Sequence, residues 1–224
     1  MALVAVNSTT ARLAANLTRE GRQVLISPLE AFGTILLATD WADLGLFPPA
    51  EKVAINTNVT RESIKAQDPS GGPDLLLVED TTEVTATYDN IPVLTPDETV
   101  RALHVGSVPV ALTDPALTGG TISPFAPGAS IPARMIVIRR HQGGADPLYK
   151  VYWHPRVAIQ NNGEGDNQNR ETLQFRVPVQ SYLGTLSAAL APYSAQVGPM
   201  GAIFTILASQ LDALLDILKA EAAA

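Results

Sequence analysis

Two stretches of this chain alternate polar and apolar residues with a period that suits a β-strand. In residues 53–62 the apolar side chains are Val53, Ile55 and Val59, and residues 83–89 repeat the pattern. Side chains two residues apart in a strand share a face, so each stretch has one apolar face for a core. The opposite face is wholly polar and carries Asn56, Asn58, Thr60, Glu62, Glu83, Thr85, Thr87 and Asp89. A sheet built from these strands must leave that face in water.

The surrounding segments indicate an antiparallel sheet. Residues 66–73 are rich in Gly, Pro and Asp, which favours a long hairpin loop. A glycine pair at 143–144 would bridge a second hairpin, and the polar residues 161–169 predict another loop. Further strands are predicted at 75–78, 135–140, 148–153, 157–160 and 171–177. Strands joined by such turns pair antiparallel.

A short helix is predicted after the second alternating stretch. Thr95 suits its N-cap, with Pro96 at the first helical position and Glu98 completing a capping box. Gly106 then ends it. Residues 107–133 are rich in Pro, Gly, Ser and Thr and are too long for a routine connection. They predict a projecting loop or an arm onto a neighbour, with a flexible linker as the alternative.

The C-terminal segment, residues 209–222, predicts an amphipathic helix. Ser209 suits its N-cap, with Asp212 three residues later. The leucines at helical spacing are Leu211, Leu214, Leu215 and Leu218. This apolar face would cover the chain's own sheet or dock on a partner. The whole pattern predicts a mainly β fold in a single domain, residues 1–224: an antiparallel β-sandwich or half-barrel with one flanking α-helix and an added C-terminal helix.

Composition bounds the chemistry of the 224-residue chain. It contains no cysteine, so disulfides, thiolate metal ligands and a thiol nucleophile are excluded. Its formal charge of −7 argues against ordinary nucleic-acid binding, because a phosphate-binding surface needs an excess of Lys and Arg. The first residues show no signal-peptide pattern. Residues 177–211 carry no charge, but Gln180, Pro192, Gln196 and Pro199 interrupt them, so we expect no membrane span.

The motifs that usually carry catalysis or metal binding are missing from the sequence. No Gly-x-Ser-x-Gly occurs, and the near match at residues 128–132 lacks the second glycine. His104, His141 and His154 lack the spacing of metal ligands. Residues 163–168 place carboxylates where a phosphate-binding loop needs backbone amides. We therefore expect no catalytic residue, no cofactor and no metal site, and we do not expect an enzyme.

Arg139 and Arg140 form the one basic cluster of note in the sequence. Together with Lys150, Arg156 and Arg176 they could form a patch that binds an acidic neighbouring subunit. An ordinary solvated face of the sheet explains the same residues equally well. The sequence alone leaves both interpretations open.

The order of these features is more informative than any one of them. Trp41, Gly45 and Pro48 precede the strand at 53–62, and the loop to Pro73, the strand at 83–89 and the helix from Thr95 to Gly106 follow it. A second series runs from Tyr152 to Ile159, through a polar loop containing Gly163 and Glu164, to the strand at 171–177. This layout resembles the tail tube, or major tail, proteins of long-tailed phages and of related particles such as gene transfer agents. Residues 107–133 and the C-terminal helix look like additions to the common core.

The resemblance implies a structural role. In that family each subunit contributes strands to a barrel around the lumen of a hexameric ring, and the rings stack into a tube. It implies that the lumen is lined by Asn56, Asn58, Thr60, Glu62, Glu83, Thr85, Thr87 and Asp89. It implies that an adjacent ring or subunit is contacted by Gln67, Asp68, Pro69, Ser70, Gly71 and Gly72. DNA would pass such a lumen without being held, because its phosphates would meet no cations to bind.

The implied partners are copies of the chain itself, with tape measure and tail terminator or initiator proteins. The expected location is the tail of a virion or a phage-derived particle, assembled in the host cytoplasm. Two other interpretations remain: a carbohydrate- or receptor-binding β-sandwich module of a virion, and a small hydrolase with a dispersed site. The eight polar residues would then form the outer solvated face of an ordinary sandwich.

Overall fold

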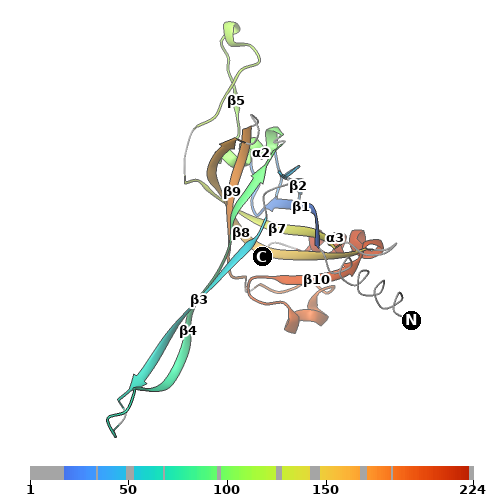
Figure 1. Ribbon diagram of the computed structural model, residues 1–224. Coiled ribbons are helices and arrows are strands. Elements are labelled where there is room, and N and C mark those ends of the chain that lie inside the picture. The colour runs from blue at the N-terminus through green and yellow to red at the C-terminus, as the bar shows by residue number, and fades with distance from the viewer. Residues whose placement is uncertain are drawn as a thin grey trace, which may run out of the picture.

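The computed structural model describes residues 18–33, 35–48, 53–67, 69–94, 97–124, 128–141, 147–166, 171–182 and 184–221. The strands are β1 (Thr18–Pro28), β2 (Ala42–Asp43), β3 (Ile55–Ala66), β4 (Leu75–Val93), β5 (Val110–Ala111), β6 (Thr121–Ile122), β7 (Ser130–His141), β8 (Leu148–Asp166), β9 (Glu171–Val179) and β10 (Ala202–Leu207). The helices are α2 (Glu98–Val105) and α3 (Leu211–Ala220), with 3₁₀ turns at Pro115–Leu117, Ala191–Gln196 and Ala208–Gln210. Figure 1 shows a body from which two thin projections extend in opposite directions.

Eight strands form one antiparallel sheet in the order β2-β1-β7-β8-β9-β4-β3, with β10 paired to β8. One edge of β8 pairs with β7, and its other edge is shared: residues 148–153 pair with β10 and residues 157–166 with β9. The predicted mainly β, antiparallel fold with a flanking helix and a C-terminal helix is confirmed. No pairing among the described residues joins β2 to β3, so the sheet is open and not a closed barrel.

The centre of the sheet is buried on both faces because neighbouring residues of its strands enter two different cores. One core contains Val24, Ile26, Met135, Val137, Val157 and Phe175, and α2 adds Val100 and Leu103. The other contains Leu25, Ile136, Ile138, Val151 and Trp153, and α3 adds Leu215 and Leu218. Strands buried on both faces read as continuous apolar runs in the sequence, as β7 does. A helix therefore covers each face of the sheet.

The helix ends differ from their predicted caps. The N-cap of α2 is Asp97, whose carboxylate accepts a 2.8 Å hydrogen bond from the Val100 amide, so the predicted Thr95 cap is wrong. Thr95 and Pro96 lie outside the described residues. Gly106 ends the helix as predicted, with a left-handed φ of 80°. α3 starts at Leu211, after Gln210 at the N-cap position, so the predicted Ser209 cap is also wrong.

The C-terminal helix lies on the chain's own sheet. Leu215 and Leu218 are buried against Trp153 and Ile138, which confirms the first of the two alternatives for its apolar face. Arg134 fixes the end of this helix, because its guanidinium donates to the Glu221 carbonyl at 2.8 Å and to Ser27 Oγ at 2.7 Å. The predicted extension to residue 222 runs beyond the described residues. No helix in the described ranges is long and apolar enough to cross a membrane.

The strand boundaries correct three expectations. Residues 75–78 and 83–89, predicted as two segments with an interruption between them, form the one continuous strand β4. Residues 161–166, predicted as a loop, continue β8, because Asn161 and Glu164 pair with Phe175 and Leu173 of β9. Residues 130–133, placed in the predicted 107–133 loop, belong to β7. The pairing of β7 with β8 is as predicted, and the glycine pair at 143–144 that was expected to bridge them lies outside the described residues.

The two projections have different constructions. The first, which we call the arm, consists of residues 56–85 of β3, the following turn and β4, and runs to the lower left in Figure 1. The second, the insertion, consists of the described residues between 107 and 129, with the small hairpin of β5 and β6. It extends upward in Figure 1. The sequence predicted a projecting segment here, but not its hairpin.

Candidate assembly and channel surface

Strand register brings most of the predicted lumen residues together. Asn56 lies opposite Thr87, Asn58 opposite Thr85, and Thr60 opposite Glu83. Directly opposed residues share a face of an antiparallel pair, so these six form one polar surface, and Asp89 extends it. Beyond a register shift at 60/61, where β4 carries the extra residue Thr82, Glu62 pairs with Asp80 and keeps the alternation of Asn58 and Thr60 along β3. All but the half-buried Thr87 are exposed.

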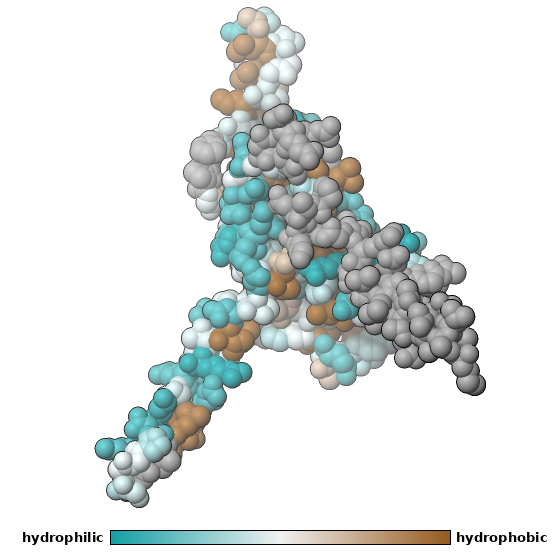
Figure 2. All heavy atoms as spheres, viewed as in Figure 1, coloured by the Kyte–Doolittle hydropathy of each residue, from teal (hydrophilic) through white to brown (hydrophobic). Residues whose placement is uncertain are grey.

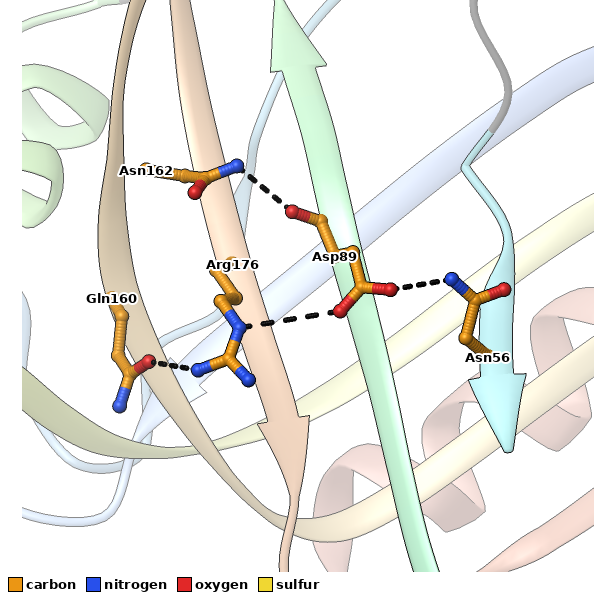
Figure 3. Close-up of polar contacts among 5 residues, drawn as sticks. All are labelled: Asn56, Asp89, Gln160, Asn162 and Arg176. Carbon is orange, nitrogen blue, oxygen red and sulfur yellow. Dashed lines mark hydrogen bonds and ion pairs between the residues drawn. The ribbon is translucent and has the colours of Figure 1, made fainter. Parts of the chain in front are cut away.

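The polar surface continues from the arm onto the body. Figure 3 shows Asp89 between Asn56 of β3 and Arg176 of β9. The Asn56 amide donates to one carboxylate oxygen of Asp89, and Arg176 Nε lies 4.0 Å from the other. Arg176 also donates to Gln160 Oε1 at 3.1 Å, and Asn162 donates to the Asp89 carbonyl at 2.8 Å. Polar side chains of four adjacent strands, β3, β4, β9 and β8, thus form one surface.

Sequence reasoning did not assign Gln160, Asn162 or Arg176 to this surface. Residues 161 and 162 were predicted to lie in a loop, and Arg176 in a basic cluster. The useful signal was the alternation of Gln174, Arg176 and Pro178 with the buried Phe175 and Val177. Arg176 adds a cation to a surface expected to be acidic and neutral. The adjacent Asp89 carboxylate offsets that charge only weakly, because both side chains are about half exposed.

The predicted basic cluster is not one patch. Arg139 lies over the Tyr152 ring, 4.8 Å from its centroid, and donates to the Val53 carbonyl. Arg156 donates to Gln180 at 3.1 Å, whereas Arg176 lies on the polar surface described above. Arg139 and Lys150 are direct neighbours across β7 and β8. Of the five predicted basic residues, the strand register thus places Arg139 and Lys150 side by side.

The predicted contact loop, Gln67, Asp68, Pro69, Ser70, Gly71 and Gly72, lies at the far end of the arm, and its Asp68 is outside the described residues. Gly71 has a φ of +76°, a left-handed conformation that favours glycine. Gln67, Pro69 and Gly72 are exposed. The loop is therefore the part of the arm most distant from the chain's own core.

One buried arrangement resembles a catalytic pair but is packed inside the core. Tyr88 Oη lies 2.9 Å from His154 Nε2, and His154 Nδ1 lies 2.7 Å from the Met200 carbonyl. If Nδ1 donates to that carbonyl, Nε2 accepts from the tyrosine hydroxyl. Burial lowers the pKa of His154 and raises the pKa of Tyr88. Both side chains are at most 5% exposed, so the pair ties β4, β8 and the segment before β10 together.

His104 is also structural. His104 of α2 is buried, with Nε2 3.0 Å from the Gly163 carbonyl and its ring edge-on to Phe175. It thereby holds α2 against β8 and β9. Within the described ranges, no group of three or more His, Cys, Asp or Glu residues could hold a metal ion.

Comparison with known proteins adds no identification. No protein-family model matches the chain, and no curated protein is significantly similar to it in sequence.

Proposed function

We propose that this chain is a structural subunit that assembles with copies of itself into stacked rings, forming the tube of a phage-type tail or related particle. The observation that carries the proposal is the arm. All its described residues in 56–65 and 76–85 are exposed, although seven of the ten in the second stretch are Leu, Val or Thr and the other three are acidic. An isolated two-stranded ribbon is marginal in water, so such an arm needs a partner surface.

The polar surface fits the wall of a water-filled channel. It spans four adjacent strands, and neighbouring subunits could continue it around a ring. Strands that curve around a channel expose alternate residues to the lumen and to the outside. We propose that Asn56, Asn58, Thr60, Glu83, Thr85, Thr87 and Asp89 face this lumen, with Gln160 and Asn162 beside them. Glu62, which keeps the alternation of β3 beyond the register shift, extends this set toward the far end of the arm.

DNA would traverse such a channel rather than bind to it. Carboxylates and neutral polar groups cannot replace the cations condensed on DNA phosphates. Contact with this surface would therefore release few counterions, and binding would gain little free energy. Arg176 is the exception, a cation on this surface whose charge the Asp89 carboxylate offsets only weakly. The ring is expected to be hexameric, by analogy with the family that the layout resembles.

The rival function, a carbohydrate- or receptor-binding module, finds less support in the aromatic residues. Sugar platforms use exposed aromatic faces. Trp153 and Tyr88 are buried in the two cores, and Trp41 is stacked with Arg134, 5.2 Å from its ring centroid. Among the large hydrophobic side chains that are exposed in the described residues, one is aromatic: Tyr193, which is 58% exposed.

Negative-stain electron microscopy of the purified protein over a range of concentrations tests the proposal. We expect rings or hollow tubes with a central channel, because the arm and the free sheet edges provide surfaces for self-association. A chain that stays monomeric at every concentration, also when mixed with tail-initiation components, would exclude the tube function and favour the binding module.

A further inference from the structure

The C-terminal helix α3 has a second apolar stripe besides the one that packs on the sheet. Its buried stripe contains Leu215 and Leu218. The second stripe starts at the N-cap with Gln210 and continues with Ala213, Leu214 and Ile217. This is the spacing i, i+3, i+4 and i+7, which places side chains along one side of a helix. A helix that is apolar on more than one side is normally covered on each of them.

Within the described chain, the second stripe lines an open groove of roughly 580 Å³. Phe204 and Ile206 of β10 line it as well, together with Leu190 and Tyr193 from the loop between β9 and β10. Ile217 is 39% exposed, so solvent reaches the stripe. Figure 2 shows hydrophobic residues at the surface in the lower part of the body, where Figure 1 places β10. The volume lies within the range of preformed ligand sites, about 300–1,000 Å³.

The groove is uncharged, and the charge nearest to it is acidic. No residue from 177 to 211 is charged, which covers β10 and the loop. Asp216 lies three residues after Ala213, so the two side chains are neighbours on the helix surface. Asp212 lies about one turn before Asp216, both are exposed, and none of the ion pairs within the described ranges involves either. With about 3.6 residues per turn, Lys219 falls on the side of α3 away from the groove.

These features favour a basic amphipathic helix as the occupant. The stripe is about 10 Å long, or two turns of helix, which matches the anchor spacing of helices that bind in grooves. The small side chain of Ala213, in the middle of the stripe, allows a second helix to approach closely. Lys or Arg residues beside the anchors of that helix would meet the two exposed carboxylates of α3.

We propose that this groove binds an amphipathic helix of another protein, whose apolar side chains contact Leu214, Ile217 and Phe204 and whose Lys or Arg residues lie against Asp216. The partner is a different polypeptide, so the site goes beyond the proposed function and does not depend on it. The buried stripe keeps α3 on its own sheet, so binding requires no detachment of the helix.

A synthetic peptide tests the site on the monomeric protein. The probe is a fluorescein-labelled peptide of Ala, Leu and Lys, with Leu on one helical face and Lys beside it. It has about 14 residues, near the shortest length at which an isolated Ala-rich helix forms. The control peptide has Glu in place of every Lys. Fluorescence anisotropy measures both dissociation constants, and we expect the Lys peptide to bind at least about tenfold more tightly. Equal affinities would contradict the proposed acidic rim.

Substitutions locate the contact, because the net charge of −7 attracts any cationic peptide. Ala213→Arg places a long cationic side chain in the middle of the stripe, so we expect it to weaken binding of the Lys peptide at least about tenfold. The matched control is Ala116→Arg, the same change at an exposed alanine of the insertion. Circular dichroism checks that both variants fold. Equal losses in the two variants would mean that net charge alone drives binding and would overturn the proposal.

Charge reversal beside the groove gives a second readout. Asp216→Lys should weaken the Lys peptide about two- to fivefold, the size expected for exposed ion pairs, and should strengthen binding of the Glu peptide. The control is Asp74→Lys, which makes the same change at an exposed carboxylate near the far end of the arm. An effect of Asp74→Lys as large as that of Asp216→Lys would remove Asp216 from the site.

The outcomes separate the helix site from the proposed function. If the Lys peptide binds wild-type protein and not Ala213→Arg, while wild-type protein never forms tubes, the helix site stands and the tube function is wrong. If the peptide does not bind and Ala213→Arg prevents tube formation, the groove joins copies of the chain and the helix site is wrong. Binding of a single-chain detergent in the groove, without binding of the peptide, would assign it to a small amphiphile and equally overturn the proposal.

Discussion

The two ends of β4 show how the same strand behaves with and without a core. From Ala86 to Val93 the strand belongs to the body, where Tyr88, Ile91 and Val93 are fully buried. From Leu76 to Thr85 it belongs to the arm, where every residue is exposed. Both halves are antiparallel β-structure with apolar residues. Hydrogen-bonded pairing thus gives both halves the same strand conformation, whereas burial of the side chains against other elements determines how stable each half is.

The largest effect is expected for a truncation in the body. Phe175→Ala removes a fully buried side chain that packs against His104 and the α2 core. Large aromatic-to-alanine changes in cores cost about 3–5 kcal/mol of unfolding free energy. Urea unfolding, followed by circular dichroism at a protein concentration that keeps the chain monomeric, measures the change. A loss of less than about 1 kcal/mol would mean that the body is not the rigid part of the molecule.

The next effect concerns the attachment of α3. Arg134→Met keeps much of the stem that lies against Trp41 but removes the hydrogen bonds to Ser27 and to the Glu221 carbonyl. Leaving buried acceptors unpaired costs about 1–3 kcal/mol. We expect a stability loss of this size, together with faster hydrogen exchange in α3. Exchange that stays unchanged in α3 would show that its leucines alone hold the helix.

A smaller effect should follow from His154. Burial lowers its pKa in the folded state, so below about pH 6.5 the unfolded chain takes up a proton that the folded chain resists. The contribution of His154 to the free energy of unfolding is therefore fully present above that pH. It is lost as the pH falls toward the folded-state pKa, by at most about 1.4 kcal/mol per pH unit.

Urea unfolding between pH 7.5 and 5.5 checks this slope, with His154→Gln as the comparison. The variant should be less stable at pH 7.5 and should lose less stability on acidification. Equal slopes in both proteins would assign the pH dependence to other groups.

The smallest effect on the monomer is expected in the arm. Val84→Thr keeps the side-chain shape at a site that is 49% exposed, so it should change monomer stability by no more than about 0.5 kcal/mol. The same substitution should weaken assembly, because the valine is then buried by a neighbour. A large loss in the monomer would show that the arm packs on its own body.

Much of the fold was readable from the sequence because its signals are local. The alternation in residues 53–62, the apolar run from Met135 to Ile138 and the glycine stop at Gly106 all predicted elements that the structure contains. The helix starts were missed by one or two residues, because Asp97 competes with Thr95 as a cap. Nothing local marks residues 79–82 as strand, so β4 was predicted as two pieces.

The candidate surface was less predictable because exposure depends on distant segments. Val59 has the same alternation as Val53 and was expected to face the core, yet it lies where no described element covers it. The position of β10 could not be anticipated, since it depends on pairing with β8 about 50 residues earlier in the chain, beyond the reach of local patterns. The Glu62–Asp80 pair depends in turn on a register shift.

Hydrogen exchange of residues 56–85, compared between monomer and assembled tube, tests the central claim most directly. We predict rapid exchange of the arm in the monomer, because few contacts protect it, and strong protection in the tube, with little change in β7 and the rest of the body. An arm that exchanges equally fast in both states would contradict the claim that it is the element through which the chain assembles.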